Sequence, residues 1–179
     1  MDAVKALKRL INKNAVVPIE NNGKQCSFKL IESQPNYALV VTKCPDDVLI
    51  IKCDDKFPAP TNIFKGEKGE CKRADYIIVS SKEKSMLIIE LKHSDNSKAK
   101  DIEQQLRGAK CFLDYCESII SSFWGDTNIL CEYDERYFKY IHCSRKRSFK
   151  PEADKTKNNS PDRFGRIYDK VVPFGKLIR

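Results

Sequence analysis

The sequence predicts an α/β (α+β) domain built on a central mixed β-sheet flanked by helices. Its 179 residues suit a single domain, so residues 1–179 are taken as one unit. Apolar residues recur with a helical period near the N-terminus and again after residue 97. Short runs rich in apolar and β-branched residues indicate strands between and after these two segments. The order of helix, several strands, long helix and strand is typical of a mixed α/β domain.

The first part of the chain predicts one helix followed by strands. A helix is expected over residues 2–13, because apolar residues there fall on one face. Residues 58–69 contain two prolines and two glycines and predict a loop. The expected strands are Phe28–Ile31, Tyr37–Thr42, Val48–Cys53, Asp75–Ser80 and Met86–Lys92.

The second part predicts a long helix, a strand and a basic loop. The helix is expected to begin with Ser97 as its N-cap and to end near Trp124, with Gly125 as the stop signal. Strands are expected at Tyr137–Cys143 and Ile167–Phe174, separated by a flexible basic loop at 144–162. The apolar stripe that packs the helix on the sheet comprises Ala99, Ile102, Leu106, Ala109, Leu113, Cys116, Ile120 and Phe123.

The strands over 75–80 and 86–92 form a predicted β-hairpin with a polar tip. If its turn centres between Lys82 and Glu83, Asp75 lies opposite Glu90 with Cβ atoms about 4.5–5.5 Å apart. Lys92 then shares the face of Glu90, because side chains alternate along a strand. A slip of one residue would place the two acids on opposite faces. The pattern predicts two carboxylates and an ammonium in one patch.

Such a patch suits a hard divalent cation. Carboxylate oxygens without histidine or cysteine favour Mg²⁺ or Mn²⁺, which polarises a phosphoryl oxygen and activates water. An acid two residues before a lysine is weak evidence by itself. The chain contains this pattern three times, as Asp54-Asp55-Lys56, Glu70-Cys71-Lys72 and Glu90-Leu91-Lys92. Of these, only Glu90-Leu91-Lys92 both ends an apolar strand and faces a second acid.

On these residues the chain resembles the PD-(D/E)XK, or restriction-endonuclease-like, nuclease superfamily. The resemblance extends to Gln104-Gln105 in the following helix and covers residues from about 67 to 143. It implies an αβββαβ core, here with additional N- and C-terminal strands. It also implies a Mg²⁺ (or Mn²⁺) ion held by Asp75, Glu90 and the main-chain carbonyl of Leu91. Lys92 would then be the catalytic lysine and Gln105 an accessory group near the phosphate or the water.

The chain departs from the superfamily pattern at three points. Alanine, at position 74, precedes Asp75 in place of proline. The extra N-terminal acid of some members is missing or comes from Glu20 or Glu70. Neither glutamine is followed four residues later by tyrosine, since those positions are Gly108 and Ala109, which disfavours the exonuclease-like subgroup.

The basic charge of the chain is concentrated in its last quarter. The formal net charge is +8, and residues 136–179 hold 13 basic and 4 acidic side chains. This surplus favours a polyanion partner. Its densest run is expected to bind backbone phosphates, although a localisation signal or an unstructured tail would have the same composition. The residues expected to bind nucleic acid there are Arg145, Lys146, Arg147 and Lys150.

Cysteine and histidine usage excludes several other classes. The eight cysteines contain no CxxC pair, which indicates reduced, buried thiols and a cytoplasmic protein rather than a zinc or disulfide scaffold. No apolar run approaches the length of a membrane span, so no membrane association is expected. The two histidines, His93 and His142, are far apart in sequence, and His142 is expected in the core. A histidine-based nuclease or a Ser-His-Asp hydrolase is therefore disfavoured.

Together these features predict a metal-dependent nuclease that hydrolyses phosphodiester bonds, with DNA favoured over RNA and endonuclease action favoured. A phage-defence or mobile-element setting fits such an enzyme, and a homodimer or a partner protein would supply a second active site. Two other classes remain open. The chain would act either as a catalytically silent nucleic-acid-binding module or as a subunit of a larger nuclease complex.

Overall fold

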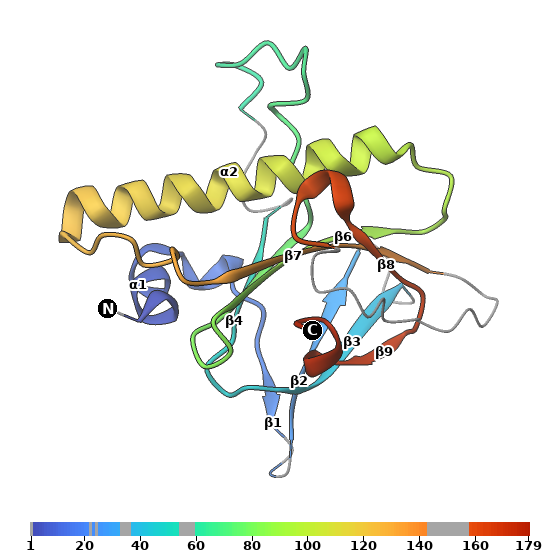
Figure 1. Ribbon diagram of the computed structural model, residues 1–179, viewed down its shortest axis with the longest axis horizontal. Coiled ribbons are helices and arrows are strands. Elements are labelled where there is room, and N and C mark those ends of the chain that lie inside the picture. Colours follow the sequence, from blue (N-terminus) through green and yellow to red (C-terminus); the bar gives the residue numbers. More distant parts are fainter. Residues whose placement is uncertain (1, 22, 24, 33–36, 54–59, 143–157) are drawn as a thin grey trace.

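The computed structural model describes residues 2–179 except 22, 24, 33–36, 54–59 and 143–157 (Figure 1). Its helices are α1 (Ala3–Leu10) and α2 (Ala99–Trp124), with short 3-10 turns η1 (Lys13–Ala15), η2 (Pro161–Arg163) and η3 (Phe174–Lys176). Its strands are β1 (Glu20–Asn21), β2 (Cys26–Ile31), β3 (Ala38–Cys44), β4 (Leu49–Lys52), β5 (Tyr76–Ser80), β6 (Ser85–Lys92), β7 (Asp134–Ile141), β8 (Gly165–Ile167) and β9 (Val171–Pro173).

The strands form two mixed sheets, which makes the protein a mixed α/β structure. The larger sheet has the order β4-β5-β6-β7-β8. Strand β5 is antiparallel to both β4 and β6, whereas α2 carries the chain across to β7, which is parallel to β6. The chain order of a helix, several strands, a long helix and a further strand is the one that the sequence predicts. The smaller sheet has the order β1-β2-β3-β9.

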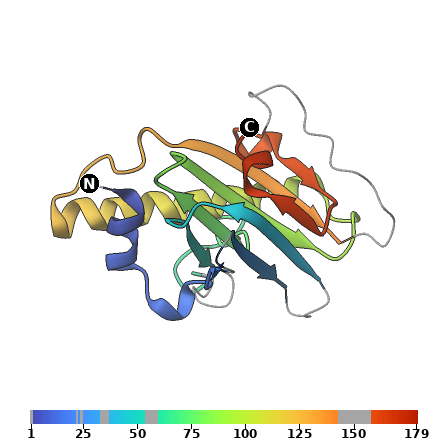
Figure 2. The ribbon, with the colours of Figure 1, turned by 90° about the horizontal axis from the view of Figure 1, so that it is seen from below.

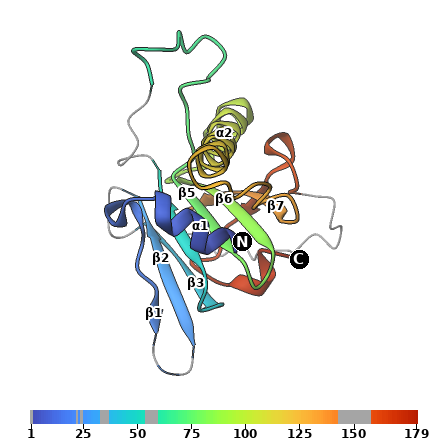
Figure 3. The same ribbon diagram turned by 90° about the vertical axis from the view of Figure 1, so that its left-hand side faces the viewer.

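Both helices lie on one face of the larger sheet, and the smaller sheet covers the other face (Figure 3). Figure 2 views the molecule from the side of the smaller sheet, with α2 behind the strands. The prediction of a single sheet flanked by helices missed this second sheet. The second sheet is needed because β5 is buried at all five positions. Both faces of the larger sheet therefore require an apolar cover, and the helices cover only one of them.

The C-terminal segment belongs to both sheets. The sequence predicts one strand over Ile167–Phe174, but the structure has β8 on the larger sheet and β9 on the smaller one. The polar residues Tyr168, Asp169 and Lys170 separate the two strands and leave no continuous apolar run for one sheet. The chain therefore links the two layers at this point.

Helix α2 begins and ends close to the predicted residues. Gly125 takes the left-handed conformation, and its N–H donates to the carbonyl of Ser121 at 3.0 Å, as the stop signal predicts. The predicted N-cap is wrong, because Lys98 occupies that position without a side-chain hydrogen bond. Two residues of the predicted apolar stripe, one at each end of the helix, are exposed: Ala99 in the first turn and Phe123, at 79%, in the last.

The hairpin of β5 and β6 has the predicted register, with Tyr76 opposite Ile89 and Ser80 opposite Ser85. Its turn has no Asn-Gly pair and is held from outside. The Asp47 carboxylate accepts hydrogen bonds from the Ser80 hydroxyl at 3.1 Å and the Lys82 N–H at 2.8 Å. Asp47 lies between β3 and β4, so a neighbouring loop fixes the turn of the hairpin.

Candidate functional site

Two carboxylates interlock at the open end of the hairpin, at the level where β5 begins. The N–H of Asp75 donates to Oε2 of Glu90 at 3.2 Å, and the N–H of Leu91 donates to Oδ2 of Asp75 at 2.6 Å. The side chain of Ile77 packs in the core beneath the helices, so Asp75, two residues earlier, projects from the same face. The hairpin therefore brings the two predicted acids together on the α2 face.

Glu90 is fully buried and forms an ion pair with Lys92. The Lys92 side chain is 25% exposed and so links the buried acid to solvent. Burial raises the pKa of the Glu90 carboxyl, although Lys92 and the Asp75 N–H act in the opposite direction. Burial lowers the pKa of the Lys92 ammonium, but the charges of Glu90, Asp75 and Glu32 outweigh it and raise that pKa above its ordinary value.

Of the two adjacent glutamines, Gln105 joins the site and Gln104 does not. The Gln105 side chain hydrogen-bonds the Glu90 carboxylate. Gln104 instead accepts from Lys72 Nζ at 2.7 Å and donates to the carbonyl of Lys68 at 2.7 Å. The two glutamines reach different partners because adjacent residues of a helix point in directions about 100° apart.

Gly108 permits the close approach that places these glutamines. A Cβ atom on Gly108 would lie 1.8 Å from the main-chain oxygen of Lys72. Helix α2 therefore rests directly on the segment that leads into Asp75. The same contact explains why tyrosine does not follow Gln104 by four residues, since no side chain fits there.

The main-chain carbonyl of Leu91 points toward the β5 side of the strand. In a strand the N–H and C=O of one residue point to the same side, and the N–H of Leu91 donates to Asp75. The next carbonyl, that of Lys92, accepts from the N–H of His142 on the opposite side, at 2.9 Å. The predicted oxygen ligand is thus directed toward Asp75.

The structure directs the two predicted additional acids elsewhere. The Glu70 carboxylate accepts from the N–H groups of Gly66 and Lys68 and so shapes its own loop. Glu20 pairs with Lys29 at 3.5 Å on the smaller sheet. Glu32, directly after β2, is the further acid whose charge acts on Lys92. No sequence pattern indicates this role for Glu32, because its proximity to Lys92 depends on how the two sheets stack.

The two histidines, distant in sequence, lie together beyond the ends of β6 and β7. Their ring centroids are 6.1 Å apart, and Tyr37 contacts both rings. His142 is half-buried rather than in the core, and burial lowers its pKa, with a further contribution from the charge of His93. The two histidines are therefore neighbours in space although they are far apart in sequence. The parallel pairing of β6 and β7 ends both strands at one edge.

Two further predictions concern the basic phosphate-binding run and the cysteines. The basic residues Arg145, Lys146, Arg147 and Lys150 lie outside the described residues, as does most of the predicted loop at 144–162. None of the seven cysteines within the described residues forms a disulfide.

The donor set of the site fits a hard cation, but the protein alone supplies few ligands. In the described part of the chain no three His, Cys, Asp or Glu side chains gather in a group suited to a metal ion. Asp75, Glu90 and the Leu91 carbonyl offer oxygen atoms only, the chemistry that Mg²⁺ prefers. Mg²⁺ keeps several waters and commonly takes one or two carboxylates, so this set is compatible with it.

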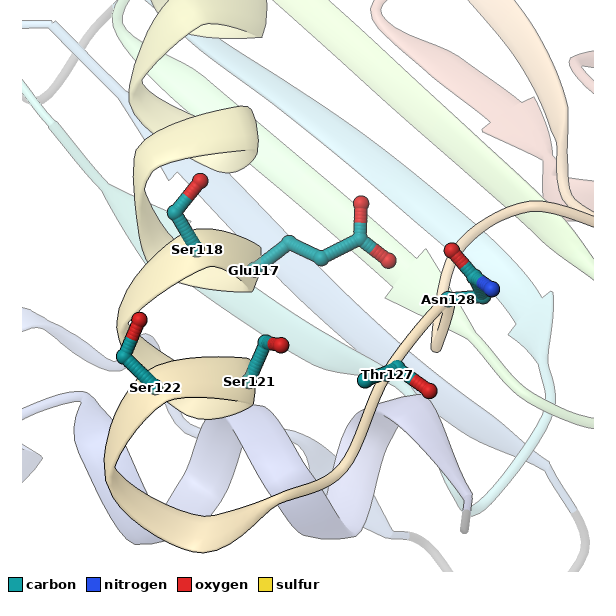
Figure 4. Close-up of a pocket in the computed structure, with 6 residues that line it drawn as sticks. All are labelled: Glu117, Ser118, Ser121, Ser122, Thr127 and Asn128. Atoms are coloured by element: carbon teal, nitrogen blue, oxygen red, sulfur yellow. The ribbon is translucent and has the colours of Figure 1, made fainter.

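A polar hollow of about 540 Å³ lies at the other end of α2 (Figure 4). It is lined by Glu117, Ser118, Ser121, Ser122, Thr127 and Asn128. Glu117 accepts a hydrogen bond from the N–H of Leu130 at 3.0 Å and is the single carboxylate in the lining. The hollow lies roughly 18 Å along the helix from Gln105. It is separate from the carboxylate site, and we assign it no role.

No protein-family model, curated protein or solved structure matches this chain. Within the described residues, no helix combines the length and the apolar character that a membrane crossing requires. The site must therefore be interpreted from its own chemistry.

Proposed function

We propose that this protein is a metal-dependent nuclease with a restriction-endonuclease-like core, hydrolysing phosphodiester bonds in DNA. The observation that carries the proposal is the interlocked Asp75–Glu90 pair, with Lys92 joining the buried Glu90 to solvent. Glu90 lies near the end of β6, which is buried at every position except Lys92, and an ionised carboxylate there is costly unless cations compensate it. Lys92 supplies one such cation, and a bound divalent ion would supply another.

In this proposal the residues of the site divide into metal ligands, a catalytic lysine and an orienting glutamine. Asp75, Glu90 and the Leu91 carbonyl hold Mg²⁺ or Mn²⁺, which when bound polarises the phosphoryl group and lowers the pKa of a coordinated water. The Lys92 ammonium donates to the attacking water or to the phosphate oxygen on which negative charge grows. Gln105, which hydrogen-bonds Glu90, orients that carboxylate. The buried strands beneath keep these groups in position.

A second function is favoured by a specific observation. Glu90 already has Lys92 and the Asp75 N–H as partners, so the cluster is also consistent with a structural ion network. The chain would then be a nucleic-acid-binding module without activity, or a subunit that acts with a partner. Such a module predicts DNA binding that does not depend on Asp75 or Glu90.

The test is to incubate the protein with plasmid DNA and with RNA, in Mg²⁺ and in EDTA, and to repeat this with Glu90→Ala and Lys92→Ala. We expect Mg²⁺-dependent cleavage of DNA by the wild type and a loss of at least about 100-fold in each variant. Cleavage that persists in both variants would refute the assignment. Binding without cleavage by the wild type would favour the silent module, and cleavage of RNA alone would correct the substrate.

A further inference from the structure

Four ionisable residues stand in one row across the larger sheet, on its α2 face. Asp75 lies opposite Glu90 by the register of the hairpin, Glu90 pairs with Lys139, and Lys139 pairs with Arg166. Ile88 and Tyr137, the pair two residues earlier, both pack in the core beneath the helices, so Glu90 and Lys139 share that face. Adjacent strands are about 4.8 Å apart. The row thus has two acids on one half and two cations on the other.

Lys139 is the unusual member of this row. It is 2% exposed, and its Nζ lies 2.9 Å from Oδ1 of Asp95. Asp95 is 46% exposed and belongs to the segment between β6 and α2. An ammonium has three donors, and Asp95 is its one partner among the described residues. A buried cation with a single, half-exposed partner is a poor source of stability, because desolvation offsets much of the attraction.

We propose that Lys139 is a second phosphate-binding cation of this site and that Asp95 is its counter-ion when no nucleic acid is bound. The inference rests on the proposed function, since it takes the phosphate to approach the Asp75–Glu90 end of the row. A phosphate there lies one strand from Lys139. Its oxygen replaces the Asp95 carboxylate as the partner of Nζ, and Asp95 is exposed enough to move away.

Arg166 extends this cationic half to the surface. It lies on the next strand, is exposed, and its guanidinium carbon is 5.8 Å from the centroid of the Phe164 ring. It is therefore placed to contact a neighbouring phosphate of the same backbone. The acidic half of the row, Asp75 and Glu90, would hold the metal, and the basic half, Lys139 and Arg166, would bind the phosphates of the nucleic-acid backbone.

A purely structural role for the ion pair makes different predictions. If Lys139 and Asp95 only fasten the segment before α2, removing either one destabilises the fold and weakens binding in the same direction. If Asp95 competes with phosphate, removing Asp95 strengthens binding, whereas removing Lys139 weakens it. The two substitutions must then have opposite effects on affinity.

The experiment measures the fluorescence anisotropy of a short labelled DNA duplex in EDTA over a series of salt concentrations. The proteins are the wild type, Lys139→Met, Lys139→Arg, Asp95→Asn and the control Lys29→Met. Lys29 is a matched control, because it is also a strand lysine paired with one carboxylate, but on the smaller sheet. Thermal unfolding of each variant is recorded in parallel.

We expect Lys139→Met to bind about tenfold more weakly and to reduce the slope of log K against log salt by about 0.9, the loss of one phosphate contact. Asp95→Asn should bind several-fold more tightly with the slope retained, Lys139→Arg should restore most of the affinity, and Lys29→Met should match the wild type. An unchanged slope in Lys139→Met, or weaker binding by Asp95→Asn, overturns the proposal. If Lys139→Met does not fold, the affinity of Asp95→Asn for the duplex tests the proposal alone. Binding by Asp95→Asn that is no tighter than that of the wild type then overturns the proposal.

These outcomes are separable from the nuclease assignment, because binding in EDTA requires no cleavage. Cleavage that persists in Glu90→Ala and Lys92→Ala would contradict the nuclease assignment. An unchanged salt dependence of binding in Lys139→Met would contradict the phosphate-binding role of Lys139, whether or not the wild type cuts DNA.

Discussion

Each end of the β5–β6 hairpin has a lysine paired with a carboxylate, but the two pairs lie in opposite environments. At the turn end, Lys82 forms an ion pair with Asp46, and their side chains are 60% and 67% exposed. At the open end, Lys92 pairs with Glu90, which is fully buried. The Lys82 side chain lowers the pKa of Asp46, whereas burial raises the pKa of Glu90.

This difference shows that composition alone does not identify a site. Water screens the exposed pair at the turn, and such pairs contribute little to stability or chemistry. At the open end the sheet and α2 exclude water, so the carboxylates interact strongly with any cation that reaches them. Their arrangement is costly without a ligand, which is the property expected of a binding site.

The largest expected effect compares Asp75→Asn with Asp46→Asn. We expect Asp75→Asn to reduce Mg²⁺-dependent DNA cleavage by at least about 100-fold, because it removes one of the two charged ligands. Asp46→Asn should leave the cleavage rate unchanged, since that acid is exposed and distant. The rates are measured on plasmid DNA over a Mg²⁺ titration. Equal rates in the two variants would show that the open end is not a metal site.

The second effect tests how α2 is held over the open end. Gly108→Ala should lower the free energy of unfolding by about 1–3 kcal/mol, because its methyl group meets the Lys72 main chain. It should also lower cleavage by moving Gln105. The control is Gly175→Ala, whose added carbon meets nothing within 4 Å. Urea unfolding measures both variants, and equal stability would contradict this contact.

A third substitution removes the anchor of the turn end. Asp47→Ala should cost about 1–2 kcal/mol of unfolding free energy, since the buried Ser80 hydroxyl and the Lys82 N–H lose their acceptor. Cleavage should stay at the wild-type rate. Glu132→Ala serves as the control, because that carboxylate is 76% exposed and 3.5 Å from Lys84. A loss of stability as large in the control would mean that Asp47 has no special role.

The smallest effect is pH-dependent and again concerns the turn end. Asp2 accepts from the Ser81 hydroxyl at 2.6 Å and from the N–H of Lys5 at 3.1 Å. Burial acts to raise its pKa, but these hydrogen bonds and that of the Val4 N–H outweigh it, so the pKa lies below the ordinary 3.8. A lowered pKa stabilises the fold above pH 3.8 and ceases to do so as pH falls through the folded value.

Asp2→Asn should therefore cost less than about 1 kcal/mol at neutral pH, because asparagine also caps helices well. The difference from the wild type should shrink as the pH falls below 3.8. Unfolding in urea across a pH series measures it. A difference that stays constant into acid would show that ionisation of Asp2 does not contribute.

The parts of the fold that depend on local pattern can be predicted from the amino-acid sequence. Two apolar runs joined by a polar tip predicted the hairpin, and a turn centred between Lys82 and Glu83 predicted the register in which Asp75 lies opposite Glu90. The apolar stripe similarly located α2, and Gly125 its end. These features are local because a strand or helix places neighbours in sequence at fixed offsets in space.

The surroundings of the Asp75–Glu90 pair depend on contacts between residues that are distant in the chain. Whether Gln104 or Gln105 faces Glu90 depends on the contact of Gly108 with Lys72, and the position of Lys139 beside Glu90 depends on the crossover through α2. Glu32 reaches the site from a different sheet. Such contacts join residues far apart in the chain, and no local period encodes them. They follow from how the layers pack to cover both apolar faces of one sheet.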